Sequence, residues 1–423
     1  MTLLATSFLS LLLFSGEADF QTQFVGGLKA LNQQDLATAK TDLLAANRLQ
    51  PANPRVWAAL AQTYWRLKQP AAAAAAAEKA EKLGPDDPVT LHALAFFYAE
   101  QAKFSKAGDM EARCAAKDDK DAAATTRAML DYLRAEQPKK AIDLALATPG
   151  WEGRADIRNL LGKAYDADGQ ILKVLPELRE AVQLKPDDES YYCDLLQAML
   201  SHYDFEVAIT FGELGRKRFP ASAQIALDTG VAYYGAYQTG AAIDAFLATI
   251  ALDPAAEQPY SFLARLIDDA HDKLPAITQR FVEYQAKTPG NYLGYFLHAR
   301  ALMAAAQDPE LAESLLRQSI ALEGKYWESH YRLGLLLEKK RELAEAEKEF
   351  RRSTELNPKD PVAHYHLFRA LAGQGKIKEA EAELAVQRKV SADFQTYLGE
   401  HAGVVKRIDI KIQGQAAPAA PGK

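Results

Sequence analysis

The sequence predicts an all-α protein, a superhelical solenoid in which antiparallel helix pairs stack one after another. Three observations support this prediction. A pattern of 34 residues recurs from residue 20 to residue 394, alanine occupies one position in ten of its eleven copies, and proline occurs near the end of six copies. A single helix pair is too small to bury its apolar face alone, so consecutive pairs must share a continuous core.

The first element is residues 1–18, which we predict to be a signal peptide. Residues 3–14 are almost wholly apolar, a run too short to span a bilayer and typical of a signal-peptide core. Small residues follow at Gly16 and Ala18, spaced like a cleavage site that ends at Ala18. One usual element is missing, because no lysine or arginine precedes Lys29. The alternative is an uncleaved N-terminal helix that caps the fold.

Eleven repeats come next, which we group as repeats 1–4 (residues 20–154), repeats 5–8 (155–292) and repeats 9–11 (293–394). Each repeat has 34 residues except 122–154, which has 33, and 257–292, which has 36. Both exceptions contain the tripeptide Thr-Pro-Gly, at 148–150 and 288–290, where proline followed by glycine favours a turn.

Two positions of the repeat, counted from its first residue, are reserved for small side chains. Position 8 is glycine or alanine in seven repeats, and position 20 is alanine in ten. We expect these positions to lie where the two helices of a pair approach most closely, with large residues at positions 4, 11 and 24 beside them. The occupants of position 20 are Ala39, Ala73, Ala107, Ala141, Val174, Ala208, Ala242, Ala276, Ala312, Ala346 and Ala380.

This pattern closely resembles the tetratricopeptide repeat family. Repeat 2 shows the match well, with Trp57, Leu60, Ala61, Tyr64, Ala73, Ala80 and Pro85 at the characteristic positions. The resemblance covers residues 20–394. It implies a right-handed superhelix of helix pairs, here named helix A and helix B, and it implies binding of protein or peptide partners.

The C-terminal segment beyond the last repeat has two predicted parts. Residues 391–412 would form a short capping helix over Ser391 to Leu398, followed by a brief extended stretch with alternating apolar residues at 408, 410 and 412. A flexible tail is the simpler interpretation of that stretch. Residues 413–423, rich in alanine and proline, are expected to be disordered.

Composition and spacing argue against catalysis, metal binding and nucleic-acid binding. The net charge of −6 over 423 residues offers no basic surface for a phosphate backbone. Cys114 and Cys193 lie in different repeats, and Cys193 has no evident histidine and acid partners in its own repeat. His364 and His366 point to different faces of one helix. The residues outside the repeats are too few for a catalytic domain with its own core. We therefore expect no enzymatic activity, no cofactor and no metal.

A partner-binding groove is expected on the concave wall, which in this family is lined by positions 2, 5, 9, 12 and 13 of helix A. No repeat pairs a basic residue at position 5 with asparagine at position 9, so the family's known carboxylate clamp is absent. Aromatic and arginine side chains favour binding. The predicted groove residues are Phe24, Leu28, Arg55, Trp65, Arg66, Phe96, Leu130 and Arg134 in the N-terminal half, and Tyr234, Arg265, Tyr331, Tyr365 and Arg369 in the C-terminal half.

Together these features predict a non-enzymatic scaffold or adaptor that binds peptide segments, periplasmic or secreted, in a bacterial cell-envelope assembly. After removal of the leader we expect no membrane span. One alternative is a helical-repeat protein that binds RNA, which would need a basic groove. Another is a cytoplasmic adaptor, if the leader is not cleaved. The sequence leaves the partner and the oligomeric state open.

Overall fold

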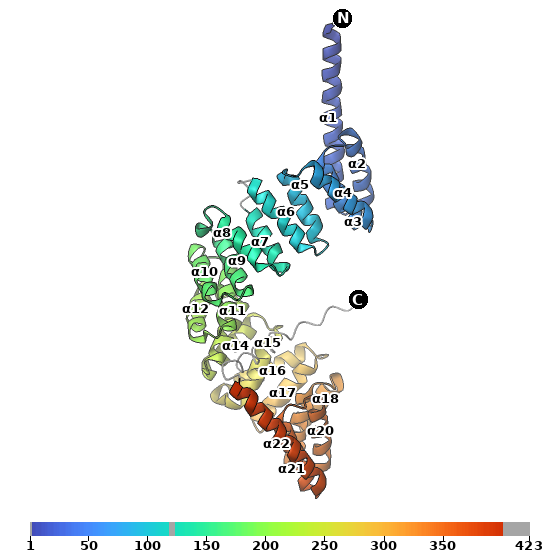
Figure 1. Ribbon diagram of the computed structural model, residues 1–423. Helices are drawn as coiled ribbons and strands as arrows, with labels where there is room; N and C mark the ends of the chain where they lie inside the picture. The colour runs from blue at the N-terminus through green and yellow to red at the C-terminus, as the bar shows by residue number, and fades with distance from the viewer. Residues whose placement is uncertain (1, 118–122, 401–423) are drawn as a thin grey trace. The chain divides into compact units, whose positions relative to one another are not determined.

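A computed structural model describes residues 2–117 and 123–400, and describes side chains for 17–117 and 123–393. The chain divides into two compact units, Met1–Tyr191 and Tyr192–Lys423, here called the N-terminal and the C-terminal unit. Each unit is a solenoid of α-helices, so the predicted fold class is confirmed (Figure 1).

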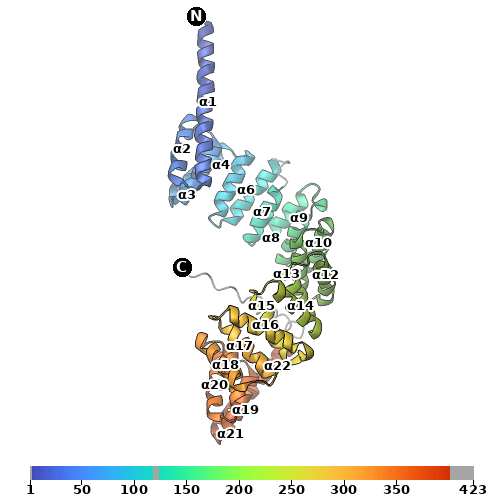
Figure 2. The same cartoon turned by 180° about the vertical axis from the view of Figure 1, so that it is seen from behind.

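The N-terminal unit consists of consecutive antiparallel helix pairs (Figure 1 and Figure 2). Its helices are α1 (Thr2–Asn32), α2 (Leu36–Leu49), α3 (Pro54–Arg66), α4 (Pro70–Leu83), α5 (Pro88–Ala99), α6 (Phe104–Lys117), α7 (Ala124–Arg134), α8 (Pro138–Ala147), the short 3₁₀ helix η1 (Trp151–Gly153), α9 (Ala155–Ala167) and α10 (Ile171–Leu184). Helix α11 (Glu189–Ser201) contains the boundary between the two units.

The C-terminal unit continues the same pattern. Its further helices are α12 (Phe205–Arg218), α13 (Ala223–Gly235), α14 (Thr239–Leu252), α15 (Glu257–Leu266), the 3₁₀ helices η2 (Ile267–Asp269) and η3 (His271–Lys273), α16 (Leu274–Lys287), α17 (Tyr292–Ala304), α18 (Pro309–Leu322), α19 (Trp327–Lys339), α20 (Leu343–Leu356), α21 (Pro361–Gly373) and α22 (Ile377–Glu400). The described residues thus form eleven α-helical pairs, the predicted number.

Most A helices begin at the predicted residue because the local sequence provides a start signal there. Helices α3, α5 and α21 have proline in the first turn, where its missing N–H costs nothing. The side chains of Asn53, Asp87 and Asp360 accept hydrogen bonds from backbone N–H groups of that turn. Proline and cap together fix where each of these repeats starts.

Repeat 9 begins at Tyr292, one residue earlier than predicted. At position 4, Trp57 and Tyr260 donate a hydrogen bond to the carbonyl six residues earlier, and His330 and His364 each place Nε2 against the equivalent carbonyl. The residue that donates this bond in α17 is Tyr295, to Pro289. The 36-residue unit is therefore two repeats of 35, each with one extra residue in its A–B connection.

The same shift explains one failure of the alanine rule. Position 20 is buried in the other repeats, but Ala276 is exposed and Ile277 is fully buried in its place. The extra residue precedes α16, so helix B enters one residue late and presents the next side chain to the contact.

The small residues at position 8 face a large residue at position 24 of the same repeat. A Cβ added at Gly27, Gly162, Gly230 or Gly334 would lie 2.7 Å from a side-chain atom of Leu43, Leu178, Phe246 or Phe350, respectively. No ordinary Cβ contact is that short. The predicted close approach of helices A and B is confirmed at these four repeats.

The two ends of the chain differ from the predicted elements. Helix α1 runs through Ala18 without a break. Residues 391–400 continue α22 and form no separate capping helix, because neither glycine nor proline interrupts residues 377–398. The predicted extended stretch, from residue 401, and the tail 413–423 lie outside the described residues. In the part of the chain that the structure describes, no helix is both long enough and apolar enough to cross a bilayer.

Candidate functional site

The A helices of neighbouring repeats pack against one another and form a continuous surface in each unit, which we call the A-helix wall. In the N-terminal unit α3 contacts both α1 and α5, and α7 contacts α9. In the C-terminal unit α15 contacts α17, and α19 contacts α21. All predicted groove residues lie on these helices or on α13, so the predicted positions do share one class of surface.

Two of the predicted residues in the N-terminal unit are open apolar contacts. Phe96 on α5 is 48% exposed and Leu130 on α7 is 40% exposed. Phe24, Leu28 and Trp65 are only half-exposed, because they pack against the buried residues of repeats 1–3. The ring of Phe24 stacks on Phe20 with 5.6 Å between centroids. The apolar part of the predicted groove is therefore centred on α5 and α7.

The predicted arginine edge of that groove is neutralised by acidic neighbours. Arg55 forms an ion pair with Asp87 at 2.8 Å. Arg66 forms one with Glu100 at 2.8 Å, and its guanidinium lies 5.8 Å from the centre of the Phe96 ring.

Arg134 is held in the same way, because its guanidinium lies 3.4 Å from Asp131. Arg55 and Arg66 therefore link consecutive A helices, and none of the three offers an uncompensated charge to a partner.

Tyr331 was predicted to line the groove of the C-terminal unit, but it is only 9% exposed. His366 of the following A helix covers it, with 5.9 Å between ring centroids, and Phe350 lies on its other side. Tyr365 occupies the same position in the last repeat and is exposed. Position 5 is thus covered wherever another A helix follows.

The other predicted residues of this unit differ in exposure. Tyr234 is half-exposed and meets Phe262 edge-on at 5.2 Å. Arg265 is exposed. Arg369 lies 3.3 Å from Glu338, with its guanidinium 5.9 Å from the Tyr365 ring. These residues are distributed over α13, α15 and α21 and do not form one cluster.

The sequence analysis missed Arg300 and Arg332, two arginines on α17 and α19. Arg300 was placed at position 8, but in the observed register of repeat 9 it occupies position 9, which faces the wall. Its side chain is 4% exposed, and Arg332 is partly exposed. An arginine at a position reserved for small residues was the signal that the register was wrong.

Cysteine and histidine are used in the packing. Cys114 is buried and contacts the Pro88 carbonyl at 3.6 Å. His330 lies 2.6 Å from Glu349, and His366 lies 2.8 Å from Glu338. Over the described residues, no group of three or more histidine, cysteine, aspartate or glutamate side chains is placed to hold a metal ion.

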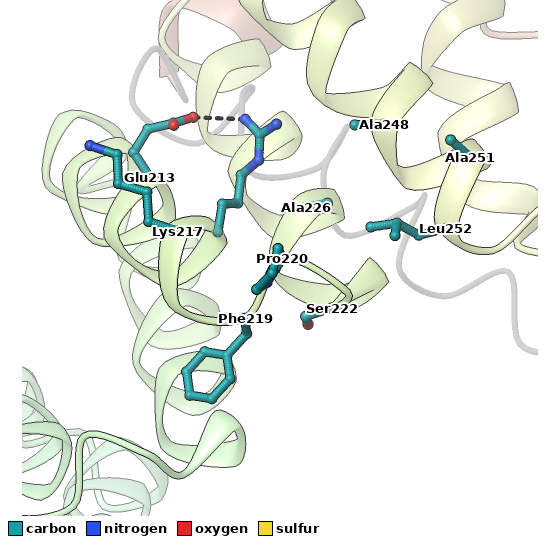
Figure 3. A pocket seen from close by; sticks show the side chains of 10 residues that line it. Glu213, Lys217, Phe219, Pro220, Ser222, Ala226, Ala248, Ala251 and Leu252 are labelled. Carbon is teal, nitrogen blue, oxygen red and sulfur yellow. Dashed lines mark hydrogen bonds and ion pairs between the residues drawn. The ribbon is translucent and has the colours of Figure 1, made fainter.

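Two hollows of about 440 Å³ lie in the C-terminal unit. The first is bounded by the end of α12 and by α14, with Pro220, Ala248 and Leu252 in its lining (Figure 3). Its cation Arg216 is hydrogen-bonded to Glu213 at 2.8 Å. The second lies between α17 and α19, with Met303 and Leu335 in its lining.

The geometry defines an α-helical repeat protein whose exposed wall is built from A helices. Residues 54–97 and 296–361 each match a family model described as the tetratricopeptide repeat. Together with the eleven helix pairs, these matches show that the chain is a tetratricopeptide repeat protein. Such proteins generally bind protein or peptide partners, and the fold is generally a non-enzymatic scaffold for protein–protein interaction.

Solved structures with a similar fold are distant in sequence. Yeast Tom70 is 16% identical with a TM-score of 0.38, covering 93% of this chain and 99% of its own. The C-terminal part of a repeat protein from Cytophaga hutchinsonii is 17% identical with a TM-score of 0.42, covering 64% and 98%. A structure reported as Pseudomonas aeruginosa pilF is 16% identical with a TM-score of 0.34, covering 59% and 99%. No curated protein matches the sequence.

Proposed function

We propose that the chain is a scaffold of a bacterial cell envelope that holds a peptide segment of a partner against the A-helix wall of its N-terminal unit. The observation that carries the proposal is the pair of exposed apolar side chains Phe96 and Leu130 on that wall. Apolar and aromatic side chains that are open in the free protein are the ones whose burial drives association.

The exposed residues occupy position 9 of consecutive repeats, on α5 and α7. A ligand that contacts both must follow the stacking direction of the A helices, as an extended or helical segment does. Because Arg55, Arg66 and Arg134 already pair with carboxylates, binding there depends on apolar burial more than on charge. We therefore expect partner capture in this unit to depend only weakly on salt.

The test is a photo-crosslinking phenylalanine analogue at position 96, followed by identification of the crosslinked segment in the source cell. The double variant Phe96→Ala/Leu130→Ala should weaken capture of that segment by tenfold or more, roughly the loss of two interface contacts. The matched control is Leu146→Ala/Leu172→Ala, which removes two exposed leucines from the B helices α8 and α10. Equal capture by both double variants, each with unchanged helicity, would refute the groove.

Localisation in the envelope is supported by the apolar run at residues 3–14 and by the packing of α1. The first buried residue described is Phe20, while residues 17–19 are exposed. Cleavage after Ala18 would therefore keep the described core of repeat 1 and leave Asp19 at the start of a helix, where a negative charge is favourable.

Intact-mass measurement on protein from the native host tests this part separately. We expect a mature chain that begins at Asp19. A mass that includes Met1 would support the cytoplasmic adaptor instead and leave the groove proposal standing.

A further inference from the structure

We propose that Arg300 and Arg332 form a second partner-binding site, on the A-helix wall of the C-terminal unit, which takes a carboxylate side chain of an acidic peptide. The site lies on α17 and α19 and does not depend on the groove of the N-terminal unit. Its occupant is an aspartate or glutamate followed by an apolar residue.

Arg300 is buried, and its hydrogen-bonding capacity is only partly used. Its Nη2 donates to the Ala264 carbonyl oxygen at 3.2 Å and to Asp268 Oδ2 at 3.1 Å. Its Nε is buried and meets no acceptor. A buried guanidinium is normally satisfied, because an unpaired buried charge is costly.

Arg332 is less satisfied still. Among the residues that the structure describes, no carboxylate or carbonyl accepts a hydrogen bond from it, and its Nε is buried without a partner. Its guanidinium lies 5.4 Å from the centre of the Tyr331 ring. Burial, and then the positive charge of Arg300, lower the pKa of Arg332, which shows that the two charges act on each other. Two guanidinium groups held within reach of each other need an anion from outside.

The acidic groups nearby leave room for one more negative charge. Asp268 is already bonded to Arg300, and Glu328 accepts a hydrogen bond from the Tyr326 hydroxyl at 2.7 Å. Both act on Arg332 as charges without bonding to it. Because these acids and the exposed Asp269 keep the excess positive charge small, a singly charged carboxylate fits better than a doubly charged phosphate.

The hollow between α17 and α19 adds an apolar contact next to the arginines. Its lining includes Met303 on α17 and Leu335 on α19, each one helical turn beyond Arg300 and Arg332. One turn is about 5.4 Å, which is within the reach of adjacent peptide side chains. The hollow of about 440 Å³ has room for an aliphatic side chain next to the bound carboxylate.

The test is an array of immobilised decapeptides probed with the full chain. It contains peptides with aspartate or glutamate next to leucine, the same peptides with asparagine or glutamine, and the same peptides with phosphoserine. We expect the acidic set to be bound and the amide set to be bound roughly tenfold less, as expected when one charge-assisted interaction is lost. Arg332→Gln should remove the preference and Arg332→Lys should retain part of it.

The matched control is Arg352→Gln on the B helix α20, whose ion pair with Glu355 is on the surface. A preference for acid over amide that survives Arg332→Gln would overturn the proposal, and so would binding of phosphoserine peptides alone. Hydrogen exchange of α19 excludes a purely structural role, for which Arg332→Gln would lower protection there. Phe96→Ala/Leu130→Ala should leave the acidic preference unchanged, so this site and the N-terminal groove can fail independently.

Discussion

Replacing Gly334 by alanine tests the rule that governs the contact between helices A and B. A Cβ on Gly334 would lie 2.7 Å from both Cδ1 and Cε1 of Phe350, a side chain that is 0% exposed. The ring is enclosed, so it cannot move aside freely. Gly240 on α14 is the matched control, because a Cβ there meets nothing within 4 Å.

The magnitude follows from comparing the two variants. Both gain helix propensity, worth up to about 1 kcal/mol for alanine over glycine. Only Gly334→Ala also overpacks the core, which costs about 1–3 kcal/mol. The propensity gain largely cancels in the comparison, so Gly334→Ala should be less stable locally than Gly240→Ala by about 1–3 kcal/mol.

Hydrogen exchange measured by mass spectrometry is the suitable assay, because a repeat array does not unfold in one step and a single midpoint would average over repeats. Exchange gives the opening free energy of α19 and α20 separately from that of α14. Protection of α19 and α20 in Gly334→Ala at or above the wild-type level would refute the packing rule. Far-UV circular dichroism confirms that both variants keep their helices.

Three further variants test other parts of the argument. Burial raises the pKa of Asp228 from 3.8 to about 7, so the folded chain keeps a proton that the unfolded chain releases. The unfolding free energy should therefore fall as pH rises from about 4 to 7, and urea titrations at pH 5 and pH 8 should show no such fall for Asp228→Asn. Gly150 has φ of +70° and Gly290 does not share this conformation, so alanine should cost roughly 1–2 kcal/mol at Gly150 and little at Gly290 in thermal unfolding. Ile277→Ala should cost about 2–5 kcal/mol in local exchange of α16, which it would not if Ala276 were the buried contact.

The arrangement into helix pairs could be predicted from the sequence because its signals are local and repeated. Proline in the first turn and a capping side chain mark the start of α3, α5 and α21 without reference to the rest of the chain. The small residue at position 8 recurs often enough to identify the contact even before its partner at position 24 is known.

Exposure within the predicted groove could not be predicted, because it depends on which repeat follows. Tyr331 and Tyr365 occupy the same position of consecutive repeats, yet only Tyr331 is covered by a following A helix. The neutralisation of Arg55 and Arg66 has the same origin. Their acidic partners Asp87 and Glu100 lie 32 and 34 residues later, in the next repeat.

The position of Arg300 shows how an irregularity in the repeat creates a potential site. Had repeat 9 begun at residue 293, Arg300 would occupy position 8, where in repeat 10 even the Cβ of an alanine at Gly334 would clash with Phe350. The extra residue in the connection between α15 and α16 instead moves Ala299 into that position, where it is fully buried. Arg300 then turns toward α15 and bonds to the Ala264 carbonyl and Asp268. The insertion that interrupts the 34-residue period is therefore what places a buried guanidinium next to Arg332, and deleting one residue from 270–273 should disrupt the acidic-peptide site while the other repeats keep their packing.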